Sequence, residues 1–200
     1  ISTEYITIHK DIKTNYHYVL MYEGERTILI KHEKYPYALP EIGTPKWLYL
    51  SSLGENSLTF HEEIAQYLAS HPDVKLAFQP GTYQMKFGKD AMAAFYKRAE
   101  VCVCNKEEAQ RILGEDTPNI KELLQKMRDL SPRIMCISDG PRGAFAYDGK
   151  EMWGITMYPD PAPPISRTGA GDAFTSTFVV AIIRGHDIPT ALQWGPINSM

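Results

Sequence analysis

Three small residues, Gly169, Ala170 and Gly171, stand directly before an acid, Asp172, in the segment SRTGAGDAF. Glycine is costly in regular structure, so the cluster predicts a tight turn or a backbone that lies close to another molecule. The apolar residues from Phe174 onward recur at helical spacing, which places the cluster at a helix start. A helix start presents unpaired N–H groups and the positive end of the helix dipole, so this one is a candidate site for an anion such as phosphate.

Asp172 points to chemistry beyond binding. A carboxylate repels a neighbouring phosphate, so the acid is better explained if it contacts the hydroxyl that attacks the phosphate. In phosphoryl transfer most catalysis is positioning and charge stabilisation, and an aspartate that accepts the nucleophile's proton is a recurring part. The structural alternative is that the three small residues form only a turn and Asp172 only caps the helix, which aspartate does well. The pattern alone leaves both interpretations open.

Composition favours a globular protein with a small-molecule partner. The chain has 200 residues, 44% of them apolar, and a formal net charge of -3, which suits one large domain or one domain with an appendage. It carries no block of like charge, so no nucleic acid and no membrane surface is expected as a partner. No apolar stretch approaches the length of a membrane span.

The three cysteines are an odd number in apolar, strand-like surroundings, which indicates a reducing compartment and a cytoplasmic protein. The chain stops at Met200 inside a helix-like pattern. We therefore expect it to be an excerpt of a longer protein.

Strand patterns and helix patterns alternate along the segments that must position Asp172. A hairpin is expected over residues 16–30, with its turn near residue 24. Buried strands are expected in KWLYLSSLG, VKLAFQPG, AEVCVCN and RIMCISDG. Helices are expected in SLTFHEEIAQYLASH, KEEAQRILG and residues 89–98, 120–127 and 174–185, and an antiparallel pair in GAFAYDGKEMWGITM. This alternation predicts an α/β fold, a mostly parallel sheet with helices on both faces.

Ligands of such sheets gather at the carboxyl ends of the strands. Five polar residues lie at these carboxyl ends: Ser51, Ser52, Gln79, Asn105 and Asp139. GAGD falls at the start of the last long helix, so it joins the candidate site.

Four segments together resemble one known family. Neither a P-loop, nor a GxGxxG turn after a first strand, nor a protein-kinase motif set occurs. Instead GERTIL (24–29), NKEE (105–108), ISDGPRGAF (137–145) and TGAGDAF (168–174) resemble, in the family's order, segments of the ribokinase-like, or PfkB, carbohydrate and nucleoside kinases. The resemblance implies a three-layer α/β/α fold with a small β lid.

The resemblance also implies a reaction, the transfer of the ATP γ-phosphoryl group to a hydroxyl of a small sugar or sugar acid, with Mg²⁺. Asp172 would be the base that faces the acceptor hydroxyl, and Gly169, Ala170 and Gly171 would form the anion hole. Asn105 would reach the ATP phosphates, and Glu108 would hold Mg²⁺ or its water shell. By spacing alone, Asn105 and Glu108 are better explained as a helix cap and a solvated helix face.

Four further positions are implied to face the nucleotide, Ser138, Gly140, Thr168 and Asn198, with Gly143 shaping the loop. The alternatives are an ordinary strand-to-strand turn for the 138–143 segment and a polar helix face for Asn198. Ser166 stands where the family commonly has an aspartate of a monovalent-cation site, so potassium activation is not expected. Arg167 is expected to point to solvent rather than to the phosphates.

The domain organisation follows from the same comparison of segments. Residues 1–14 form a lead-in of uncertain role, residues 15–33 the β lid, and residues 34–200 an incomplete catalytic and nucleotide-binding domain. A two-stranded hairpin is not stable alone, so its aromatic residues must cover the substrate, a second copy in a homodimer, or their own domain. The family's opening strands and sugar-binding segment have no counterpart in residues 1–14, so the acceptor is not identified.

Two alternative functions stay open. One is a nucleoside kinase of adenosine type, whose distinguishing residues would lie in the absent segment. The other is a non-catalytic nucleotide-binding or regulatory protein of the same fold, against which the intact GAGD and Asp172 count.

Overall fold

A computed structural model of the chain describes residues 2–22, 25–159 and 168–199. Six strands form one sheet in the order β3-β4-β5-β6-β7-β8. Their bounds are β3 (Trp47–Leu50), β4 (Lys75–Phe78), β5 (Ala99–Asn105), β6 (Ile134–Ser138), β7 (Ala144–Tyr147) and β8 (Met152–Ile155). Strands β3 to β6 run parallel, and β7 and β8 continue the sheet antiparallel. The predicted α/β fold with a mostly parallel sheet is confirmed.

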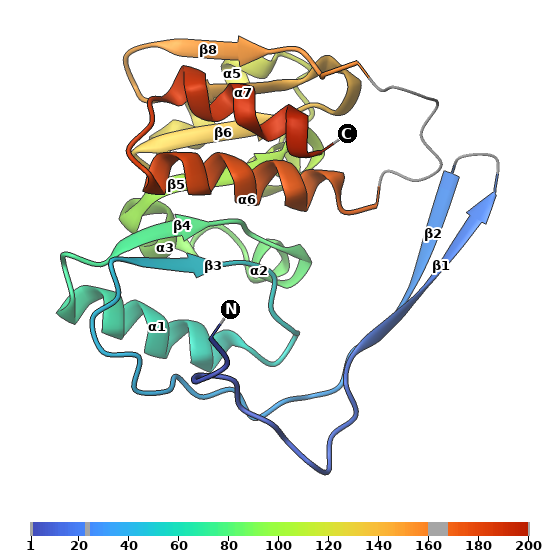
Figure 1. Cartoon of the computed structure of the whole chain (residues 1–200), viewed down its shortest axis with the longest axis vertical. Coiled ribbons are helices and arrows are strands. Elements are labelled where there is room, and N and C mark those ends of the chain that lie inside the picture. The colour runs from blue at the N-terminus through green and yellow to red at the C-terminus, as the bar shows by residue number, and fades with distance from the viewer. Residues whose placement is uncertain (1, 23–24, 160–167, 200) are drawn as a thin grey trace.

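The helices cover both faces of this sheet. They are α1 (Leu58–Ser70), α2 (Thr82–Phe87), α3 (Ala93–Arg98), α4 (Lys106–Leu113), α5 (Ile120–Asp129), α6 (Ala170–Ile183) and α7 (Ile188–Asn198). Strand β5 shows the division: Cys102 and Cys104 pack in the core with α1, α3, α4 and α5, whereas Val101 and Val103 pack with α6 and α7. Successive strand residues point to opposite faces, so one apolar strand serves both cores. Helices α6 and α7 lie together on one side of the sheet (Figure 1).

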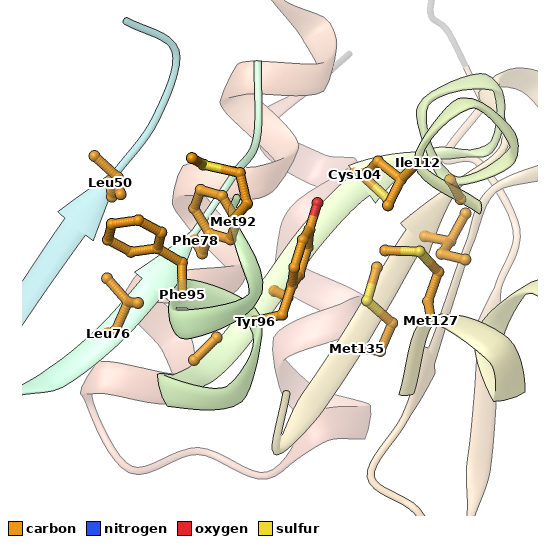
Figure 2. Packing of buried hydrophobic residues seen from close by; sticks show 14 of the residues in the cluster. Leu50, Leu76, Phe78, Met92, Phe95, Tyr96, Cys104, Ile112, Met127 and Met135 are labelled. Carbon is orange, nitrogen blue, oxygen red and sulfur yellow. The ribbon is translucent and has the colours of Figure 1, made fainter. Parts of the chain in front are cut away.

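Aromatic rings fill the core under α1 and α3. Phe78 of β4 lies 5.7 Å from Phe95 and 5.3 Å from Tyr96, measured between ring centroids. Figure 2 shows Met92 beside these rings, with Cys104, Met127 and Met135 continuing the cluster toward α5. The three cysteines are free and buried, and burial raises the pKa of each thiol, so none is a ready nucleophile.

One predicted helix was wrong in its extent. Residues 82–98 form two short helices, α2 and α3, instead of one helix over 89–98. Gly88 ends α2 with φ of +90°, a conformation that no other residue type adopts cheaply, so the helix cannot continue through it.

Strands β1 (Tyr16–Tyr22) and β2 (Glu25–Lys31) form a separate antiparallel hairpin, whose turn at residues 23 and 24 lies outside the described residues. The hairpin extends away from the large sheet (Figure 1). Its side chains are exposed on both faces: Tyr18 and Leu29 pair on one, Val19 and Ile28 on the other. The division of the chain into lead-in, lid and catalytic domain stays a prediction.

No helix in the described ranges has the length and apolarity that crossing a membrane requires.

Candidate active site

The first turn of α6 is open to a ligand. Its N-cap is Gly169, which takes φ of +85° and offers no side chain to the helix N–H groups. The first intrahelical bond runs from the N–H of Ala173 to the carbonyl of Gly169, at 2.8 Å, so the N–H groups before it lack helical partners. A Cβ added at Gly171 would meet nothing within 4 Å, so packing within the protein does not explain this glycine. Free N–H groups and open space together suit an anion.

Asp172 lies inside this first turn, three residues after the cap. The structural alternative, in which Asp172 is only the cap, therefore does not describe this helix. The side chain is exposed, and its Oδ1 accepts a hydrogen bond of 3.0 Å from Nε2 of Gln79, the residue that follows β4. The carboxylate is thus tied to the carboxyl end of a strand rather than to its own helix.

A cavity of about 210 Å³ lies at this place, where the carboxyl ends of β4, β5 and β6 meet the start of α6. Its lining is mostly polar, as a phosphate or a hydroxyl requires. It is lined by Gln79, Cys104, Asn105, Glu108, Ser138, Gly169, Gly171, Asp172 and Thr175. Seven of these are residues that the sequence predicts for the site, drawn from four separate segments.

Asn105 and Glu108 cap α4 against each other. The Asn105 Oδ1 accepts from the Glu108 N–H at 2.8 Å, and the Glu108 Oε2 accepts from the Asn105 N–H at 2.9 Å. This capping box is the helix-cap alternative realised, yet both residues also line the cavity. The pKa of Glu108 is raised, chiefly because the carboxyl is withdrawn from water and secondarily because Asp172 is near, although the Asn105 bond opposes the shift. A nearby cation would offset this cost.

A larger cleft of about 350 Å³ adjoins the cavity and shares Asn105, Ser138 and Gly171 with it. Gly140 and Gly143 line it from the turn between β6 and β7. A Cβ at Gly143 would lie 1.9 Å from the carbonyl oxygen of Ile155, and φ there is +94°, so only glycine fits. The backbone of this turn therefore comes close enough to β8 to form one wall of the cleft.

A buried acid fixes the same turn. Both oxygens of Asp139 accept from the Arg142 guanidinium at 2.6 Å, and the Lys106 ammonium lies 3.9 Å from one of them. A bidentate pair of this kind holds its geometry well. Asp139 thus stabilises the cleft wall, a role that its position after a strand did not indicate.

Residues 1–196 match the family described as pfkB family carbohydrate kinase. The chain belongs to this family. The resemblance seen in the four segments is confirmed, and so is the ribokinase-like fold. A PfkB protein from Polaromonas sp. JS666 superposes with a TM-score of 0.70 at 16% identity, over 94% of this chain and 66% of that one.

Two curated relatives are sugar or sugar-acid kinases by name. An ATP-dependent 6-phosphofructokinase of Thermoanaerobacterium thermosaccharolyticum is 27% identical over 128 residues, 62% of this chain and 38% of that protein. A 5-dehydro-2-deoxygluconokinase of Clostridium perfringens is 28% identical over 120 residues, 56% of this chain and 34% of that protein. The matched part therefore spans little more than a third of either relative.

One residue predicted to face the nucleotide in this PfkB chain, Asn198, lines neither the smaller cavity nor the larger cleft. Asn198 donates a hydrogen bond of 2.8 Å to Thr177 and lines a separate hollow between α6 and α7. Its neighbours Pro196 and Ser199 line the larger cleft in its place. Thr168 is exposed beside the start of α6, and Ser166 and Arg167 lie outside the described residues.

Glu108 is the candidate ligand for the metal ion that accompanies a nucleotide. Among the residues that the structure describes, no group of three or more histidine, cysteine or acidic side chains could hold a metal by itself. Mg²⁺ typically takes one or two carboxylates and otherwise phosphate oxygens and water. Glu108 fits that need, because its Oε2 is bonded to the backbone while its second oxygen has no bond from the described part of the chain.

Proposed function

We propose that this chain is the catalytic and phosphate-binding part of an ATP-dependent phosphotransferase that acts on a hydroxyl of a small sugar or sugar acid. The observation that carries the proposal is the position of Asp172, whose carboxylate lines one small cavity together with the open α6 start and Glu108. A base, an anion site and a candidate metal ligand at one place are what phosphoryl transfer needs.

In this proposal each group has one task. Asp172 accepts the proton of the acceptor hydroxyl through Oδ2, because Oδ1 is already held by Gln79. The N–H groups of Gly171 and its neighbours at the start of α6 donate to the phosphoryl oxygens as negative charge gathers there. When bound, ATP supplies the phosphoryl group and Mg²⁺ neutralises its charge. Asn105 and Glu108 lie beside that charge in the smaller cavity. Ser138, Gly140 and Gly143 line the nucleotide's side in the larger cleft.

The acceptor class rests on the relatives. Both named relatives act, by their names, on sugar phosphates or sugar acids, which favours such a substrate here. Of the two alternatives, a nucleoside acceptor and a nucleotide-binding protein without turnover, neither is favoured by a specific observation. They remain outcomes of the experiment below.

The hairpin completes the proposal as a lid. Its two exposed apolar faces support two contacts, one with the acceptor and one with a second copy of the chain in a homodimer. A lid that excludes water would suppress hydrolysis of ATP. A cytoplasmic location is also proposed, and the three free, buried cysteines support it.

The experiment is ADP release by the full-length natural protein with Mg-ATP, over a panel of ketoses, pentoses, sugar acids and nucleosides. Release with one sugar or sugar acid supports the proposal and names the substrate. ADP production only with a nucleoside would show that the acceptor is a nucleoside rather than a sugar. A protein that binds ADP but produces none from ATP with any acceptor would contradict the proposed transfer.

A further inference from the structure

Two side chains reach Asp172 from the edge of the sheet. Tyr49 of β3 is paired in register with Ala77 of β4, whose side chain packs in the core under α6 and α7. Gln79 lies two residues beyond Ala77, so it points to the same face of the sheet. The alternate residues Leu50 and Phe78 enter the opposite core. The pleat therefore aims Tyr49 and Gln79 together at the side where α6 begins.

The backbone fixes this pair of strand ends. The N–H of Gln79 donates to the carbonyl of Leu50 at 2.9 Å, which extends the β3–β4 pairing by one residue past β4. The sheet therefore fixes the backbone of Gln79, and its side chain lines the cavity from that fixed position.

Three side chains then form a directed chain of hydrogen bonds. Oη of Tyr49 donates to Oε1 of Gln79, and Nε2 of Gln79 donates to Oδ1 of Asp172 at 3.0 Å. An ionised carboxylate only accepts, so the amide must present its NH₂ to Asp172 and its oxygen to the tyrosine. Tyr49 must then donate. Its pKa is raised to about 12, mainly by burial and further by Asp172, so the hydroxyl keeps its proton at neutral pH.

We propose that Gln79, oriented by Tyr49, is a positioning residue that holds Oδ1 of the Asp172 carboxylate so that Oδ2 faces the acceptor hydroxyl. This inference rests on the proposed function, because it assigns the carboxylate a hydroxyl to face. Apart from its bond to Gln79, the exposed Asp172 side chain has no hydrogen bond from the described residues, so the sheet edge sets its rotamer. A misplaced base costs turnover even when every ligand still binds.

The test compares Gln79→Leu and Tyr49→Phe with the wild type and with Gln125→Leu, an exposed glutamine of α5 remote from the cavity. The first readout needs no activity: the ¹³C chemical shift of the Asp172 carboxyl carbon at neutral pH in the ligand-free protein, assigned with Asp172→Asn. The Gln79 amide donates to this carboxylate, so Gln79→Leu should displace the resonance because the hydrogen bond is lost. Tyr49→Phe should displace it in the same direction by less, and Gln125→Leu should leave it unchanged.

The second readout is the full-length enzyme's kinetics with the acceptor that the panel identifies. Gln79→Leu should lower kcat about tenfold or more while KM for ATP stays within about twofold. An Asp172 carboxyl resonance unchanged in both Gln79→Leu and Tyr49→Phe would overturn the inference. If the wild type transfers no phosphate but the variants displace the resonance, the proposed function fails and the hydrogen-bond chain stands, so the two failures are distinguishable.

Discussion

The side-chain amide of Gln79 lies 3.0 Å from the carboxylate of Asp172, although 93 positions separate the two residues in the chain. One belongs to the carboxyl end of a parallel strand and the other to the first turn of a helix on the face of that sheet. Such an edge is where α/β proteins bind ligands, because strand ends and helix starts meet there. The contact joins the acid to the rigid part of the fold.

Substitutions of Gly171 test the anion site, because they should affect ADP affinity and the free energy of unfolding in opposite directions. Gly171→Ala should raise the free energy of unfolding by up to about 1 kcal/mol, because alanine favours a helix and its Cβ meets nothing within 4 Å. ADP affinity, measured by calorimetry, should fall, and Gly171→Val should weaken it about tenfold or more by blocking an N–H donor. Ala69→Val, at an exposed position of α1, controls for a branched residue in a helix. Unchanged ADP affinity in Gly171→Val would contradict the anion site.

Gly143 tests the wall of the larger cleft. Gly143→Ala should lower the free energy of unfolding by about 2–4 kcal/mol, because its Cβ collides with the Ile155 carbonyl and its φ is positive. Gly140→Ala, three residues earlier, meets no atom within 4 Å and should cost only about 1 kcal/mol for its φ of +50°. Denaturant unfolding checks both. Equal losses in the two variants would show that the close approach to β8 does not constrain this turn.

His61 predicts a loss of stability in acid. Its ring is buried beside Phe87 and Phe95, its Nδ1 bonds the Ser57 carbonyl, and its Nε2 has no partner among the described residues. Burial lowers the pKa of His61, so the unfolded state binds its proton more tightly than the folded state. The contribution of His61 is therefore full above pH about 6.5 and is lost as pH falls from there through the lowered folded value.

Urea unfolding at pH 5 and pH 7.5 measures this loss. His61→Leu should remove part of the difference between the two pH values, whereas His17→Gln on the exposed hairpin should leave it intact. A pH dependence in His61→Leu as steep as in the wild type would assign the loss to other groups.

Substitutions on the two faces of the hairpin should affect acceptor binding and dimer formation separately. Leu29→Lys places a charge on the face shared with Tyr18, and Ile28→Lys places one on the face shared with Val19. If one face covers the acceptor and the other a second copy, one variant should raise the acceptor KM and the other should shift the mass measured by light scattering toward the monomer. Both variants should keep the wild-type melting temperature within a few degrees, because these side chains are exposed. Wild-type KM and mass in both would exclude the lid and dimer roles.

Much of the fold could be predicted because its signals are local. Apolar runs marked the strands, and Gly-Ala-Gly before Asp172 marked a helix start that the structure places at Ala170. Helix α2, over Thr82–Phe87, was missed, since six residues are too few to show an apolar periodicity in the sequence.

The site was predictable only in part, because its contacts join distant segments. Gln79 stood out as a polar residue after a strand, but nothing near it in the chain names Asp172 as its partner. Asn198 illustrates the converse. The family resemblance predicted it at the nucleotide, whereas its side chain on α7 bonds to Thr177. Residues on a helix of uncertain phase cannot be assigned to a cavity by position alone.

The substitution Asp172→Asn tests whether Asp172 is the base of a phosphoryl transfer. Asparagine keeps the shape of the side chain and an oxygen that can accept from Gln79, but it cannot take up the hydroxyl's proton. The measurement is transfer of labelled γ-phosphate to the identified acceptor by the full-length protein, with ADP affinity determined on the same samples. We predict a fall in kcat by a factor of about 10²–10⁴ with ADP affinity nearly unchanged. Turnover in the variant close to that of the wild type would contradict the claim and remove Asp172 from the mechanism.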